Sequence, residues 1–74
     1  MIYELDRVVL ADRIDDAGLE VGDIGTVVFL YKQNKGYEVE FKTLSGETVA
    51  VVTLLALQVR RIRDREIAHV RAIA

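Results

Sequence analysis

Apolar and polar positions along the chain predict five short β-strands. The clearest spans 37–42, where Tyr37, Val39 and Phe41 alternate with charged residues, a pattern typical of a half-buried strand. Elsewhere the signal is enrichment in Val, Ile and Leu, which suit a pleated sheet. The other four predicted strands span 5–11, 24–32, 47–53 and 59–62.

Four glycines mark the predicted turns and close approaches. Gly22 is expected at a positive φ in the turn before the second strand, and Gly25 is expected where another strand crosses closely. A hairpin turn is expected over 33–36, with Asn34 and Gly36 where positive φ is needed, and Gly46 is the expected left-handed residue of the next turn. Strands joined by such short turns predict a closed or nearly closed barrel over residues 1–62, with a helical or 3₁₀ turn at 54–57.

The remaining residues, 63–74, form an amphipathic segment. Asp64 is placed to cap a helix over 65–73, which would align Ile67, Val70 and Ile73 on one face. An extra strand is the alternative, since the same residues also alternate. A helix this short needs a surface to dock on, so we expect the segment to pack against the barrel or a second subunit.

Composition limits the class of protein. The chain has 74 residues, 51% of them hydrophobic, which predicts one small folded domain. It has no cysteine, so neither disulfides nor thiolate chemistry contribute, and we expect a cytoplasmic protein. The longest apolar stretch, from Val49 to Leu57, is far shorter than a membrane span, so we expect no membrane association.

Charge is distributed unevenly. The balance is −5 over residues 1–57 and +3 over residues 58–74, within a formal net charge of −2. An acidic loop over 12–20 precedes the second strand, and its apolar Ile14 and Leu19 are expected to cover one end of the barrel. An acidic body repels phosphate backbones, which disfavours nucleic acid as the partner.

Two resemblances meet in these residues. The stretch Gly22-Asp23-Ile24-Gly25-Thr26-Val27-Val28 resembles the KOW motif of SH3-like barrels in ribosomal and transcription-elongation proteins. That likeness implies an SH3-like fold and RNA binding, but the motif is usually surrounded by Lys and Arg rather than by acids. The chain from about Leu5 to Ile62 is similar to a family of short bacterial and cyanobacterial proteins, domain of unknown function 4926. The segments that carry this second resemblance are 5–10, 17–19, 37–41, 46–48 and 51–54.

Candidate catalytic groups are few. Ser45 lies in a predicted turn and His69 in the C-terminal segment, and each is the only residue of its kind. The adjacent carboxylates Asp15 and Asp16 lack the alternating ligand spacing of a calcium loop. Glu38 and Glu40 lie on the outer face of a predicted strand, where charge keeps a sheet soluble. We therefore expect no enzymatic activity, catalytic residue, cofactor, metal or small-molecule substrate.

Together these patterns predict an all-β, SH3-like small five-stranded barrel with a short C-terminal helix or extra strand. The predicted function is a non-catalytic protein-interaction module that binds a protein partner or itself as a homo-oligomer. Alternatives are KOW-type nucleic-acid binding through the C-terminal arginines, or neutralising or regulatory binding to a larger protein such as a toxin. The expected contact surfaces are the acidic first loop over 12–20 and a C-terminal strip formed by Arg60, Arg61, Arg63, Arg65, Ile67, Val70 and Ile73.

Overall fold

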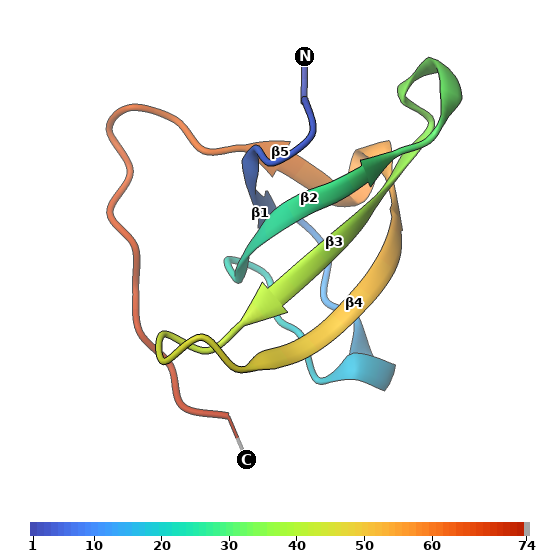
Figure 1. Cartoon of the computed structure of the whole chain (residues 1–74). Helices are drawn as coiled ribbons and strands as arrows, with labels where there is room; N and C mark the ends of the chain where they lie inside the picture. The colour runs from blue at the N-terminus through green and yellow to red at the C-terminus, as the bar shows by residue number, and fades with distance from the viewer. Residues whose placement is uncertain (74) are drawn as a thin grey trace.

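The computed structural model describes residues 1–73 and shows one antiparallel sheet of five strands in the order β4-β3-β2-β1-β5 (Figure 1). Three single 3₁₀ turns, η1 (Asp15–Ala17), η2 (Lys32–Asn34) and η3 (Ala56–Gln58), interrupt the connections, and no α-helix occurs in the described residues. The strands are β1 (Arg7–Leu10), β2 (Ile24–Leu30), β3 (Gly36–Lys42), β4 (Thr48–Leu55) and β5 (Val59–Arg61).

The all-β class and the five predicted strands are confirmed, with ends that differ by a few residues. β1 and β2 are shorter than predicted, and β4 continues two residues further, to Leu55. The alternation predicted for β3 is also confirmed, because Tyr37, Val39 and Phe41 are buried. Among the described residues no hydrogen-bonded pairing joins β4 to β5. The sheet is therefore open, with these two strands at its edges, and closure into a barrel is not confirmed.

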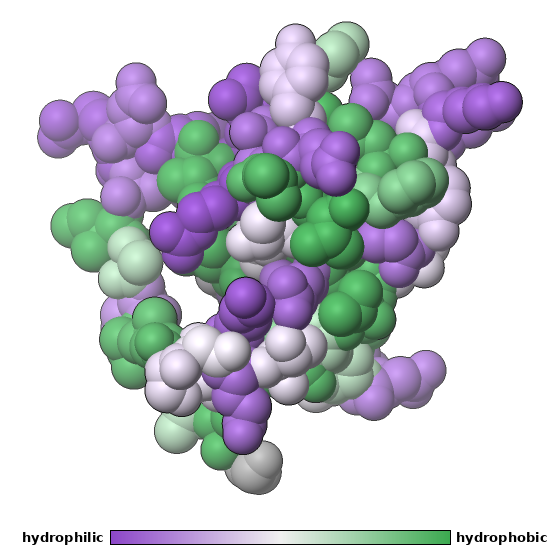
Figure 2. All heavy atoms as spheres, in the orientation of Figure 1, coloured by the Kyte–Doolittle hydropathy of each residue, from purple (hydrophilic) through white to green (hydrophobic). Residues whose placement is uncertain are grey.

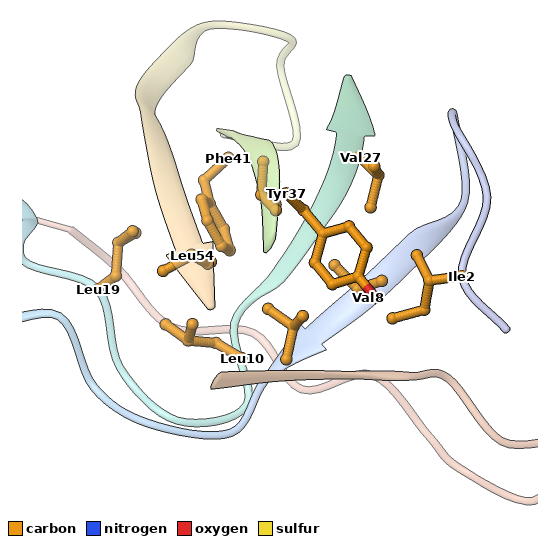
Figure 3. Close-up of a cluster of buried hydrophobic side chains, with 10 residues drawn as sticks. Ile2, Val8, Leu10, Leu19, Val27, Tyr37, Phe41 and Leu54 are labelled. Atoms are coloured by element: carbon orange, nitrogen blue, oxygen red, sulfur yellow. The ribbon is translucent and has the colours of Figure 1, made fainter. Parts of the chain in front are cut away.

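The core lies on the concave side of this curled sheet (Figure 3). Its most completely buried side chains come from four of the five strands, and Leu19 from the acidic loop covers one end at 4% exposure. Ile14 packs against the same cluster and forms a bridge with Leu19, as predicted for this loop. The fully buried side chains are Leu10, Leu54, Val8, Val27 and Val39.

The glycines act largely as predicted, with one correction. Gly22 and Gly46 have φ of 97° and 95°. Gly25 faces the core so closely that a Cβ there would lie 2.5 Å from Val39 Cγ1. Gly36 does not provide the positive φ of the hairpin: Gln33 and Asn34 do. Gly36 instead begins β3, where a Cβ would lie 2.9 Å from the carbonyl oxygen of Leu54.

The predicted C-terminal helix or extra strand is wrong. Residues 62–73, called the strap below, run as irregular chain along the outside of the sheet (Figure 1). The three apolar residues of the expected stripe are β-branched and favour a helix only weakly. In addition, the carboxylate of Glu66 accepts hydrogen bonds from Arg60 and from the Arg63 N–H, which fixes a turn at the point where the helix would start.

Candidate interaction surface on the C-terminal strap

The strap leaves two apolar side chains in water. Ile67 is 96% exposed and Val70 is 73% exposed. Burying one such side chain is worth about 1.5–3 kcal/mol, so each would be stabilised by contact with another surface. The strap is therefore not held to the sheet by the side chains that were expected to dock it.

An ion pair anchors the upstream end of the strap. Both terminal nitrogens of Arg60, on β5, contact the Glu66 carboxylate, with Nη1–Oε1 2.9 Å and Nη2–Oε2 2.6 Å. The backbone N–H of Arg63 also donates to Glu66 Oε1, at 2.6 Å. These three hydrogen bonds hold the chain in a tight turn as it leaves the sheet.

A second ion pair anchors the downstream end. Arg71 meets Asp23 in a two-point contact, with Nε–Oδ1 2.7 Å and Nη2–Oδ2 2.5 Å, and Nη2 also donates to the carbonyl oxygen of Gly18 at 3.1 Å. Glu20 lies 3.6 Å from Nη1. Asp23 belongs to the turn before β2, so this contact ties the strap to the start of the glycine-containing strand.

Both carboxylates are held in the charged form. The hydrogen bonds from Arg60 and then from the Arg63 N–H lower the pKa of Glu66 to about 2. The hydrogen bond from Arg71 lowers the pKa of Asp23, against a smaller opposing effect of burial. The Asp23 side chain is only 16% exposed, so its ion pair is the better shielded from solvent of the two.

Between the two ion pairs the strap arches away from the sheet. A cavity of about 300 Å³ separates strap residues 68–73 from the sheet, and Figure 2 shows the strap standing off from the body on the left of the view. The far wall of this cavity is mixed in character and includes Ile24, Phe41, Lys42, Leu44 and Val49.

The other predicted contact residues occupy different positions. Arg61 reaches the carbonyl oxygen of Met1 at 3.3 Å, and Arg63 and Arg65 are exposed at the turn. Ile73 lines the cavity and is 45% exposed. The structure thus brings Arg60 and Arg71 into ion pairs within the chain. It leaves Ile67 and Val70, called the tip of the strap below, exposed between them, and Val70 also lines the cavity.

The residues weighed for catalysis lie apart from one another. The Ser45 hydroxyl is 2.9 Å from the Thr43 hydroxyl in an exposed turn, and His69 is exposed on the strap. Glu38 accepts hydrogen bonds from the hydroxyls of Tyr31 and Thr53, which lower its pKa. The described part of the chain has no group of His, Asp or Glu side chains that could hold a metal ion, and no helix long and apolar enough to cross a bilayer.

Sequence reasoning missed the two ion pairs. The sequence shows an acidic body and a basic C-terminal strip, but this uneven charge did not identify Asp23 and Arg71 as a contact. These residues are 48 positions apart, and no local pattern links them. The contact between Arg60 and Glu66 was missed as well, because a helix was expected from residue 65 onward and a helix would not turn Glu66 back toward Arg60.

Comparison with known proteins agrees with one of the two resemblances. No curated protein and no solved structure matches the chain. A family model matches residues 4–61, which span all five strands and end where the strap begins. By that match, the chain belongs to the family described as Domain of unknown function (DUF4926).

Proposed function

We propose that this protein is a non-catalytic protein-interaction module whose contact surface is the tip of the strap. The observation that carries the proposal is that Ile67 and Val70 are held in water between two ion pairs. Exposed apolar groups ringed by charge are the usual composition of a protein contact site. Arg63 and Arg65 beside them supply groups suited to carboxylates on the partner.

The two ion pairs would favour binding by preorganising this surface. A free tail loses conformational entropy when a partner orders it, and that loss weakens binding. A strap fixed at Glu66 and Arg71 has already lost part of that freedom. The partner then gains the burial of Ile67 and Val70 at a smaller entropic cost.

We further propose that the sheet is of the SH3-like barrel type. Two observations support this: β5 pairs with β1, and the single 3₁₀ turn η3 carries the chain from β4 to β5. On this proposal the KOW-like stretch at Gly22–Val28 has a structural role, since Gly25 packs against the core side chains of β3. The absence of catalysis and the cytoplasmic location remain predictions.

KOW-type nucleic-acid binding is the second candidate, favoured by the exposure of Arg61, Arg63 and Arg65 at one end of the sheet. Engagement of three phosphates would give a slope of about −3 in the dependence of log affinity on log salt. Arg60 and Arg71 are already paired with carboxylates, which weakens this candidate. Titration of labelled RNA and DNA at low salt tests it, and no binding there removes it.

Quantitative affinity capture tests the main proposal. The tagged chain is expressed in the cells that make it, and captured proteins are compared between wild type, the double variant I67D/V70D and the control L57D. Leu57 is 92% exposed but lies on η3, outside the strap. We expect one dominant protein, which would also reveal a toxin-like partner, retained by wild type and L57D and lost by I67D/V70D. Equal recovery by both variants contradicts the proposal.

A further inference from the structure

The two edges of the sheet are protected to very different degrees. The β5 edge has only three residues, and two of them are arginines, which discourages pairing with another strand. The β4 edge has eight residues, Thr48–Leu55, with no charge, proline or glycine among them. Within residues 1–73, no strand pairs with its outer side. An edge of this kind is normally covered in the working state of a protein.

The register shows which backbone groups of β4 face outward. The N–H of Ala56 donates to the carbonyl oxygen of Lys35, in the same register that pairs Tyr37 with Leu54 and Val39 with Val52. Hydrogen-bonded pairs alternate in an antiparallel ladder, so Val52 and Leu54 bond inward to β3. The backbone groups of Val51 and Thr53 therefore face the free edge.

Leu55 marks the end of this free segment. Its N–H donates to the side-chain oxygen of Gln58 at 2.8 Å, so it is not available to another strand. At the other end, the register shifts between Phe41 and Lys42, where Val49 is the extra residue. The regular outward-facing part of β4 is thus centred on Val52.

We propose that β4 pairs with β4 of a second copy, antiparallel, about a two-fold axis at Val52. Val51 then lies opposite Thr53 of the second copy and Thr53 opposite its Val51, and each pair exchanges two backbone hydrogen bonds. The two sheets become one ten-stranded sheet. Val51, which is 53% exposed in the single chain, gains a β-branched neighbour across the new ladder.

The free segment can pair with a copy of itself for two reasons, one of geometry and one of charge. Its length and direction match under the two-fold axis, and no charged side chain of β4 faces another. Glu38 and Glu40 lie on the neighbouring strand β3, so the two acidic rows stay separated by both β4 strands. This contact is independent of the strap, and its test separates the two.

Sedimentation velocity over a range of protein concentrations tests the pairing. We expect wild type to form dimers and V51K to raise the dimer dissociation constant at least about tenfold, because a lysine at a strand edge opposes pairing. Glu40 lies directly opposite Val51 on β3, so the new lysine is compatible with the folded chain. The matched control, I67K, places the same charge on the strap and should leave the dimer intact.

Disulfide trapping gives a second readout that does not depend on V51K folding. The natural chain has no cysteine, so introduced thiols are unique. In an equimolar mixture of V51C and T53C, residues 51 and 53 of the two copies face each other. We expect the mixed disulfide to form there at least several-fold faster than the 51–51 or 53–53 disulfide forms in either variant alone. A wild-type chain that is monomeric at every concentration overturns the proposal. So does a dimer that survives V51K or is lost in I67K, or equal trapping in all three samples.

Discussion

At the scale of single residues, Arg71 and Asp23 carry most of the attachment of the strap. Their contact uses two nitrogens and both carboxylate oxygens, and it is more shielded than any other ion pair in the described residues. Shielding from solvent strengthens an ion pair, so this contact is the stronger of the two anchors of the strap. One arginine side chain therefore decides whether the downstream half of the strap stays on the sheet.

R71A should release the strap without unfolding the sheet. We expect elastase, which cuts after small apolar residues, to cut after Ala68 or Val70 several-fold faster than in wild type, because release of the downstream half of the strap precedes cleavage there. R71K is the matched control: it keeps the charge but not the two-point contact, and it should cleave at an intermediate rate. Cleavage of R71A at the wild-type rate would show that the ion pair does not hold the strap.

Gly25 provides a second prediction at this scale. In G25A the new methyl group would lie 2.5 Å from Val39 Cγ1 and 2.9 Å from Phe41 Cε1, so the core must shift. We expect the free energy of unfolding in urea to fall by about 2 kcal/mol. Adding V39A removes the closest atom, so V39A should cost less in the G25A background than in wild type. Strictly additive losses would contradict the overpacking explanation.

At the scale of elements, the strap is an example of charge replacing apolar packing. The helix expected for 65–73 would have buried Ile67, Val70 and Ile73 together. The structure instead uses Glu66 and Arg71 as anchors and leaves the apolar side chains outside. This arrangement makes the attachment of the strap sensitive to pH, whereas the core of the sheet contains no buried polar or charged residue to titrate.

Acid should detach the strap before it unfolds the sheet. The pKa of Glu66 is about 2 in the folded chain against an ordinary 4.5, and that of Asp23 is also lowered. A lowered pKa gives stabilisation that is complete above the ordinary value and is lost as pH falls toward the folded value. We expect the amide signal of Arg63 in NMR spectra to move between pH 4.5 and 2 while the signals of the fully buried Val8 and Val27, on strands without a carboxylate, stay fixed.

E66Q is the control for this titration. A glutamine has no proton to gain in this range, so the acid transition at Arg63 should disappear while that of Asp23 at the other end persists. Simultaneous movement of strand and strap signals would mean that the strap and the sheet unfold together, and that acid does not detach the strap first.

The sequence predicted the strands well because their determinants are local. Alternation at Tyr37, Val39 and Phe41 and the turn glycines Gly22 and Gly46 specify β-structure within a few residues. The prediction for the strap was wrong because the conformation of the strap depends on the contact of Arg71 with Asp23, 48 residues away. For the candidate site, the sequence placed charged and apolar residues on one segment, but it did not indicate which arginines are paired within the chain.

At the scale of the whole molecule, the sheet and the strap are separable. The buried core cluster runs from Ile2 to Val59 and contains no strap residue. A chain ending at Ile62 should therefore keep one cooperative unfolding transition and lose only the small contribution of the two strap ion pairs. Calorimetry checks this, and loss of the cooperative transition would show that the strap is part of the core structure.

The central claim is that the strap tip is the surface where another protein binds. Photo-crosslinking in the cells that make the protein tests it most directly, with a photoreactive residue in place of Ile67 and, as control, in place of Leu57. Both positions are more than nine-tenths exposed, so random collisions with other proteins in the cell should label them equally. If a protein binds the tip of the strap, position 67 gives one dominant covalent adduct and position 57 gives none of that mass. No adduct at 67, or the same adducts from both positions, would contradict it.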